Sequence, residues 1–241
     1  AILFYRLGDF YEMFFEDAIT VSRELELTLT GKECGLKERA PMAGVPWHSA
    51  DGYIAKLIEK GYKVAICEQV EDPAKAKGLV KREVVRIITP GTVTDANSLD
   101  EKRNNYLYSV FMSGKRGALA GADLSTGEFF VRPIENGLEG LMSVLSAEKP
   151  GEIITCDKDM LFNITSSHVE QLDNKYFGLR NAKRELMQHF GVSSLDSIGL
   201  TDDMPNQIKA AGALIYYLGE TQKIALPHIN RIEILSSGDT M

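Results

Sequence analysis

The chain has 241 residues, of which 44% are hydrophobic and 25% are charged, close to the average of folded soluble domains. A formal net charge of −7, from 27 lysines and arginines against 34 aspartates and glutamates, excludes a generally polycationic binder, and the composition excludes global disorder. Three scattered cysteines exclude a disulfide scaffold and favour a reducing, cytoplasmic compartment. Because no apolar run approaches the ~20 residues of a membrane helix, we expect no membrane association.

Residues 1–39 predict a strand, a turn and an amphipathic helix. The apolar run Ala1–Tyr5 predicts a strand that Gly8–Asp9 breaks, and because the chain opens inside this strand we expect it to be a piece of a longer protein. Alternation from Leu27 to Thr30 predicts a second strand, followed by a flexible loop over 31–39. Between the strands, apolar residues at helical spacing predict a helix and are Tyr11, Phe14, Phe15, Ala18, Val21 and Leu25.

Residues 40–90 predict a turn, a helix and two strands. Two prolines and a glycine in Pro41–Pro46 predict a turn without regular structure, and Ser49–Lys60 predicts a helix. Val64–Glu68 and Val84–Ile88 predict buried strands. The segment between them carries a cationic stripe, which suits either contact with phosphates or the protection of an edge strand by solvated charges. The stripe consists of Lys75, Lys77, Lys81, Arg82 and Arg86.

The polar stretch 89–103 predicts a linker, because it opens with Pro90–Gly91 and holds few apolar residues. Beyond it, consecutive strands followed by alternating helices and strands predict an α/β domain with a mixed sheet. The predicted strands are Tyr106–Met112, Ala118–Leu124, Glu128–Arg132 and Glu152–Thr155, and the predicted helices are Gly140–Ser146, Asn181–Phe190 and Ile208–Leu218.

The sequence holds no glycine-rich phosphate-binding motif, no G-x-S-x-G nucleophile motif and no histidine or cysteine pair at zinc spacing. One carboxylate leaves an alternative open. Asp123 lies on a predicted strand and, together with Asp157 and Asp196, could form the convergent acidic set of a metal-dependent nuclease or resolvase. Asp123 is followed by Ser-Thr-Gly, which is ordinary turn chemistry, so a capped hairpin is the favoured explanation.

Several segments resemble the MutS family of DNA mismatch-repair proteins. Phe4–Phe14 is similar to the mismatch-recognition domain of that family, and three further signature segments follow in the right order: Ala40–His48, Val64–Gln69 and Ile88–Thr92. In the second half, Gly121–Gly127 and Leu226–Ile229 resemble the family's connector domain. That domain has a ribonuclease-H-like fold and is not known as a nuclease.

The resemblance implies an α/β fold in two domains. Residues 1–90 are expected to form a mixed-sheet mismatch-recognition domain, 91–104 a linker, and 105–228 the ribonuclease-H-like connector domain. Residues 229–241 are expected to begin the next, core or lever, domain, which is truncated here.

The resemblance also implies the site. In the family motif Phe-x-Glu, present here as Phe10 and Glu12, the phenylalanine is wedged into the minor groove and stacks on a mispaired base, and the glutamate hydrogen-bonds to that base. Four residues beside the motif segments are weaker candidates for DNA contact: Leu7, Lys32, Val45 and Pro46. We expect Trp47 and Tyr53 to be core aromatics.

For the rest of the molecule, the resemblance implies a homodimeric, full-length ATPase that uses ATP and Mg²⁺, recruits MutL and works at the bacterial nucleoid. The nucleotide site would lie outside this chain, so we expect no catalytic residue, metal site or cofactor within it. With a net charge of −7 and one short basic stripe, the chain alone should bind DNA weakly. A third interpretation, besides DNA recognition and the nuclease, is a protein-docking module that uses the acidic second half.

Overall fold

A computed structural model describes residues 1–71, 78, 80–93 and 105–237. The chain divides into two compact units. Unit 1 contains residues 1–90 and 221–224, and unit 2 contains residues 91–220 and 225–241. Most of the predicted linker, and Lys75 and Lys77 of the predicted stripe, lie outside the described residues.

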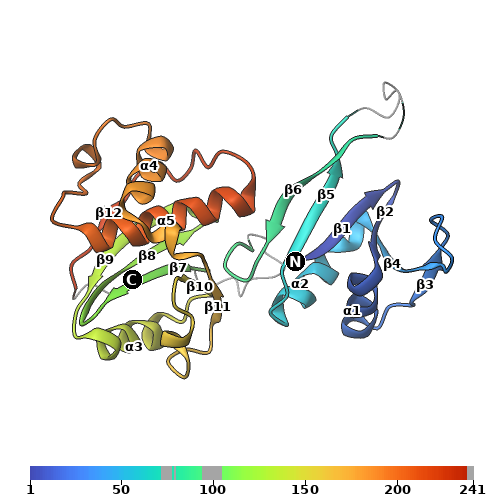
Figure 1. The fold of residues 1–241 in the computed structure, drawn as a ribbon, viewed down its shortest axis with the longest axis horizontal. Coiled ribbons are helices and arrows are strands. Elements are labelled where there is room, and N and C mark those ends of the chain that lie inside the picture. The colour runs from blue at the N-terminus through green and yellow to red at the C-terminus, as the bar shows by residue number, and fades with distance from the viewer. Residues whose placement is uncertain (72–77, 79, 94–104, 238–241) are drawn as a thin grey trace. The chain divides into compact units, whose positions relative to one another are not determined.

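Unit 1 is built on one mixed, six-stranded sheet in the order β3-β4-β2-β1-β5-β6 (Figure 1). Neighbouring strands pair in antiparallel fashion except β1 and β5, which are parallel. The strands are β1 (Ile2–Leu7), β2 (Phe10–Phe14), β3 (Thr30–Lys32), β4 (Ala40–Pro46), β5 (Val64–Gln69) and β6 (Arg82–Ile88), and the helices are α1 (Phe15–Leu25) and α2 (Ala50–Glu59).

The two helices of unit 1 lie side by side against the sheet (Figure 1). Burial alternates along the strands, so that Phe4, Met13 and Val45 are almost completely buried while their neighbours are not. Val21 of α1 and Leu57 of α2 are fully buried as well. The core of unit 1 therefore lies between the helices and one face of the sheet, and the two helices leave the other face uncovered.

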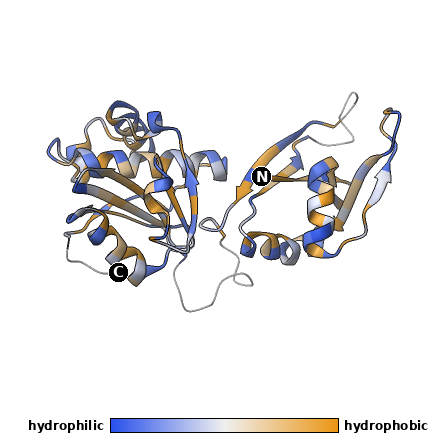
Figure 2. Ribbon diagram, turned by 60° about the horizontal axis from the view of Figure 1, so that its bottom comes forward, coloured by the Kyte–Doolittle hydropathy of each residue, from blue (hydrophilic) through white to orange (hydrophobic). Residues whose placement is uncertain are grey.

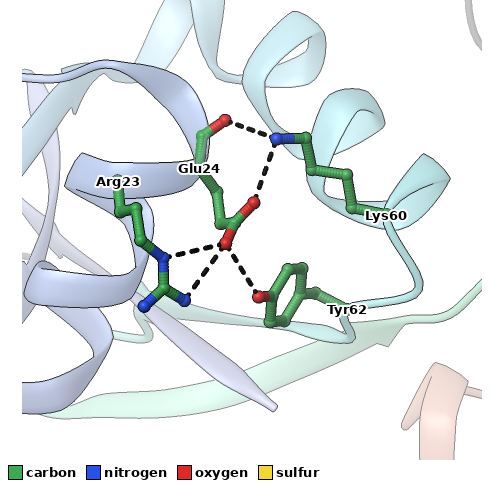
Figure 3. Close-up of polar contacts among 4 residues, drawn as sticks. All are labelled: Arg23, Glu24, Lys60 and Tyr62. Carbon is green, nitrogen blue, oxygen red and sulfur yellow. Dashed lines mark hydrogen bonds and ion pairs between the residues drawn. The ribbon is translucent and has the colours of Figure 1, made fainter.

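A polar cluster ties the end of α1 to the residues that follow α2 (Figure 3). The Glu24 carboxylate accepts hydrogen bonds from Lys60 Nζ at 3.0 Å and from the Tyr62 hydroxyl at 3.1 Å, and Arg23 Nη2 lies 3.1 Å from it. Lys60 Nζ also donates to the backbone carbonyl of Glu24 at 2.9 Å. Hydrogen bonds from Lys60, which has the larger effect, and from Arg23 lower the pKa of the Glu24 carboxyl group. This cluster is exposed, so its contribution to stability is modest.

Two predicted elements of secondary structure in unit 1 are wrong, and a third is displaced. The predicted helix from Tyr11 to Leu25 begins only at Phe15, because Phe10–Phe14 forms a strand that is hydrogen-bonded on both sides, to β1 and β4. Pro41–Pro46 is not a turn but most of strand β4. Its two prolines lie near the ends of the strand, where a missing N–H donor costs little. The strand predicted at Leu27–Thr30 starts later, at Thr30.

Unit 2 contains a second mixed sheet, in the order β11-β10-β7-β8-β9-β12. An antiparallel meander of β7, β8 and β9 is extended by β10 and β11, which pair in parallel with β7 and with each other. The strands are β7 (Leu107–Ser113), β8 (Arg116–Asp123), β9 (Glu128–Ile134), β10 (Glu152–Thr155), β11 (His168–Gln171) and β12 (Glu233–Ile234), and the helices are α3 (Gly137–Glu148), α4 (Leu179–Phe190) and α5 (Pro205–Gln222).

Unit 2 has two hydrophobic clusters. One packs residues of α4 and α5 against the sheet, and the other packs residues of α3 against it. Figure 2 shows the hydrophobic residues concentrated along the strands and on parts of the helices. The predicted mixed α/β fold class is confirmed, and every strand and helix predicted between 105 and 220 is present. Near the end of the described residues, β12 pairs in parallel with β9, and Ile229 belongs to a hydrophobic cluster of unit 2.

Candidate nucleic-acid interface

The hairpin formed by β1 and β2 positions the candidate site. Its two central residues are Gly8 and Asp9, so that Leu7 pairs with Phe10 directly across the turn. Gly8 has a φ of +59°, and a Cβ atom added there would meet nothing within 4 Å. The need for glycine is therefore conformational, as in two-residue hairpin turns that require a positive φ. Because of this turn, Phe10 is the first residue of β2 and lies at the end of the sheet.

Phe10 and Glu12 share one face of β2. Tyr11 and Met13, which alternate with them, are buried on the face that the helices cover. Phe10 is 47% exposed although it is a large hydrophobic residue. An aromatic ring at the end of a hairpin, on an uncovered face, is available to an external partner.

Glu12 sits between strands on a central part of this face. It pairs with Tyr5 of β1 on one side and with Gly44 of β4 on the other. A Cβ atom added to Gly44 would lie 3.8 Å from both Glu12 Cγ and Phe10 Cδ1. The absence of a side chain at Gly44 therefore leaves open the space beside Phe10 and Glu12.

Lys32, from the edge strand β3, is the charged partner of Glu12. Its Nζ atom lies 2.5 Å from Glu12 Oε2, and the same ammonium group is 5.6 Å from the centroid of the Phe14 ring. The Lys32 side chain is 42% exposed and that of Glu12 is 16% exposed. The two residues are 20 positions apart in the sequence, and the sheet brings them together.

The other predicted DNA contacts lie in three different environments. Leu7 is half-buried beside the hairpin turn, and Pro46 is half-buried where it pairs with Phe10. The side chain of Val45 is fully buried and pairs with Tyr11 on the helix-covered face. The structure thus brings Leu7, Lys32 and Pro46 to the surroundings of Phe10 and Glu12, whereas the Val45 side chain points into the core.

Trp47 was expected in the core, and this is wrong, because the residue is 47% exposed. Its backbone N–H donates to the carbonyl of Asp9 at 3.0 Å, which fixes it beside the hairpin turn. The guanidinium of Arg6 lies 4.4 Å from the centroid of the Trp47 ring, and Arg6 Nε donates to the carbonyl of Gly8. The sequence pattern gave no signal for this arrangement, since an aromatic residue after a proline suits a core position equally well.

The described part of the cationic stripe is engaged by other residues of unit 1. Arg82 Nε donates to the backbone carbonyl of Arg6 at 2.9 Å, and its guanidinium lies 5.3 Å from the Tyr5 ring. Lys81 pairs with Glu83 at 2.6 Å on the surface. Because Tyr5 is the cross-strand neighbour of Glu12, Arg82 and Lys32 lie on opposite sides of that carboxylate.

The side chain of Tyr11 links β2 to β5 on the face of the sheet that the helices cover. Its hydroxyl donates to Glu68 Oε1 of β5, and Arg6 Nη1 is 4.0 Å from the same carboxylate oxygen. Burial and, to a lesser extent, the hydrogen bond with Glu68 together raise the pKa of Tyr11 to about 12. At neutral pH Tyr11 is therefore a neutral donor that holds β2 in place between Phe10 and Glu12.

The carboxylate of Asp123 is part of a turn. The residue is buried, and its Oδ1 atom accepts hydrogen bonds from the Ser125 N–H at 2.8 Å and from the Ser125 hydroxyl at 2.6 Å. Within the described ranges, no group of three or more histidine, cysteine, aspartate or glutamate side chains could hold a metal ion. The described residues therefore do not assemble the acidic set, with Asp157 and Asp196, that the nuclease alternative needs.

Two family models match the sequence of this chain. MutS domain I matches residues 1–97, and MutS domain II matches residues 105–230. The two units thus define a pair of MutS-type domains, with the exposed hairpin in the first of them.

Curated relatives cover nearly the whole chain. A protein named DNA mismatch repair protein MutS from Lachnoclostridium phytofermentans is 48% identical over 239 residues, which cover 96% of this chain and 25% of the relative. The proteins of the same name from Ruminiclostridium cellulolyticum and Clostridium beijerinckii are 49% and 50% identical, over 95% and 96% of this chain. The chain belongs to the MutS family, and it spans about a quarter of the length of these relatives.

Among the described residues, no helix is both long and apolar enough to cross a membrane.

Proposed function

We propose that this chain recognises mispaired or unpaired bases in duplex DNA, and that Phe10 enters the minor groove while Glu12 hydrogen-bonds to the exposed base. The observation that carries the proposal is the half-exposed ring of Phe10, placed by the Gly8–Asp9 turn on the same uncovered face as Glu12. The relatives, which are named for DNA mismatch repair, support it.

An inserted apolar side chain distinguishes a mismatched duplex from a perfect one by how easily the duplex deforms. Inserting a side chain between base steps unstacks them at a cost of about a few kcal/mol, and the cost is lower where pairing is already faulty. Phe10 has no polar atom, so it gains from stacking without reading a particular base. Recognition by Phe10 is therefore a test of deformability.

The carboxylate of Glu12 adds selectivity. Phosphates repel a negative charge in the groove, so Glu12 weakens binding to DNA in general. A mispaired base with an unpaired donor compensates for that repulsion by a charge-assisted hydrogen bond, whereas a correctly paired base offers no such donor. Phe10 and Glu12 together favour a damaged site over a perfect one.

The remaining functions of the family are proposed for the full-length protein. We propose that ATP and Mg²⁺ bind outside this chain, whose sequence has no G-x-x-x-x-G-K-[ST] motif. We assign no reaction to the chain. Unit 2 would relay the bound state to the ATPase part and to MutL in a cytoplasmic, nucleoid-associated homodimer.

The test compares a mismatched and a perfect duplex, by fluorescence anisotropy, in a full-length MutS protein that carries this chain. Phe10→Ala should remove most of the preference for the mismatch. The matched control is Phe162→Ala, which removes a more exposed phenylalanine from unit 2 and should leave the preference intact. An undiminished preference in Phe10→Ala would contradict the proposed function.

A further inference from the structure

The ion pair between Lys32 and Glu12 joins strands of unequal freedom. Glu12 belongs to β2, which is hydrogen-bonded on both sides, to β1 and β4. Lys32 ends the three-residue edge strand β3, which is paired only with β4, and the residues that follow, 33–39, are all exposed. The backbone that carries Glu12 is therefore held on both sides, whereas the backbone of Lys32 is held on one side only.

The chemistry of the two groups agrees with that difference. A lysine ammonium is a compact, strongly hydrated charge on a flexible stem, with three donors that can be redirected to another anion. At 42% exposure, the Lys32 side chain is open to solvent, while that of Glu12 is 16% exposed. Of the pair, Lys32 is the group that can change partners at little cost.

Binding to DNA, as proposed above, gives each group a competing partner. Phosphates line the groove that Phe10 would enter, and they attract Lys32 and repel Glu12. In the DNA-free chain, the contact of 2.5 Å neutralises the carboxylate of Glu12. To accept a hydrogen bond from a base through Oε2, the Glu12 carboxylate must be released from that contact.

We propose that Lys32 is an exchangeable counter-ion of Glu12, and that it moves from the carboxylate to a phosphate when the chain binds DNA. The exchange frees Glu12 to accept a hydrogen bond from the base. At a mismatch, both groups gain a new partner. At a perfect base pair, Lys32 gains a phosphate but Glu12 gains nothing, so the exchange as a whole is more favourable at a mismatch. Lys32 itself acts on both duplexes, as a positioning residue for Glu12. This inference rests on the proposed function of Glu12.

A double-mutant cycle with Lys32→Met and Glu12→Gln tests the exchange in the full-length protein. If the ion pair is broken on binding, Lys32→Met should weaken binding to the mismatched duplex less when Glu12 is present than in the Glu12→Gln background. From the strength of exposed ion pairs, the difference should be about two- to fivefold in affinity. Lys32→Met should also reduce the salt dependence, lowering the slope of log K against log[salt] by about 0.9, the value for one phosphate contact.

Controls separate the exchange from a change of fold. Lys32→Arg keeps the charge and should keep the salt dependence. Lys60→Met breaks a comparable ion pair, with Glu24, in which the lysine is 47% exposed, and it should leave DNA binding and its salt dependence unchanged (Figure 3). Thermal unfolding of each variant verifies that the protein is folded.

Two results would overturn the exchange. A larger loss of affinity from Lys32→Met when Glu12 is present, or additive effects, would mean that the ion pair is not broken on DNA. An unchanged salt dependence would mean that Lys32 reaches no phosphate. These outcomes differ from failure of the proposed function, because that failure appears in Phe10→Ala alone, as an undiminished preference for the mismatch.

Discussion

Removing the hydroxyl of Tyr11 tests how β2 is held beneath Phe10 and Glu12. Tyr11→Phe deletes the donor to Glu68 and keeps the ring, so packing against Phe4 is preserved at a centroid distance of 5.9 Å. A hydrogen bond to a charged group contributes about 1.5–3 kcal/mol. We expect the free energy of unfolding at pH 7 to fall by an amount within that range, measured by urea denaturation.

The pH dependence of the same variant provides a second, independent measurement. The pKa of Tyr11 is raised from 10.0 to about 12 in the folded chain, so its stabilising contribution is fully present below pH 10 and is lost as the pH rises through 12. At pH 11 the unfolded phenol is mostly ionised and the folded one is not, which costs the wild-type chain about 1.4 kcal/mol. The stability difference between the wild-type chain and Tyr11→Phe should therefore shrink by about that amount between pH 9 and pH 11.

Comparison with Tyr11→Phe isolates this residue, because burial also raises the pKa values of Tyr108 and Tyr216, which titrate equally in both chains. A constant stability difference between pH 9 and pH 11 would refute the reasoning on burial. An unchanged stability at pH 7 would refute the role of the Glu68 contact.

Three further predictions concern the site and its surroundings. Gly44→Leu should lower the mismatch preference, because its side chain would fill the space beside Phe10 and Glu12. In contrast, Gly44→Ala should be tolerated, since its Cβ would meet the Tyr11 carbonyl oxygen at 3.4 Å, an ordinary contact. Fluorescence anisotropy with both duplexes measures the difference between the two variants. Asp123→Ala should lower the free energy of unfolding by about 1–3 kcal/mol, because the hydrogen bonds of the turn are lost, and Asp123→Asn should lower it by less. In calorimetry, Mn²⁺ should stabilise neither the two variants nor the wild-type chain. The chain alone should bind DNA weakly and only at low salt, given its net charge of −7, and a tight complex that persists at high salt would contradict this.

Local pattern was sufficient for most of the fold. The meander in unit 2 was predicted because its strands are short apolar runs joined by turn residues, and the helix over Ala50–Glu59 because its apolar residues recur at helical spacing. The motif around Phe10 and Glu12 was identified through its resemblance to the MutS family, which a contiguous segment of the chain carries. These features depend on residues close together in sequence.

Strands β2 and β4 show where local sequence pattern no longer predicts the conformation. The apolar residues of Phe10–Phe14 fit a helix as well as a strand, and only pairing with β1 and β4 decides between them. Likewise, the prolines of β4 predicted a turn, but pairing with β2 and β3 keeps the segment extended. A short segment of this kind takes its conformation from the hydrogen bonds that distant strands offer it.

By itself, the sequence determined the α/β class, the family and the two residues proposed to face a mispaired base. Only the tertiary structure decided that Lys32 lies against Glu12, that Val45 points into the core, and that Trp47 is exposed beside the turn. The physical reason is that residue type and spacing fix local conformation and composition, whereas contacts between charges 20 residues apart depend on the order and register of strands in the sheet.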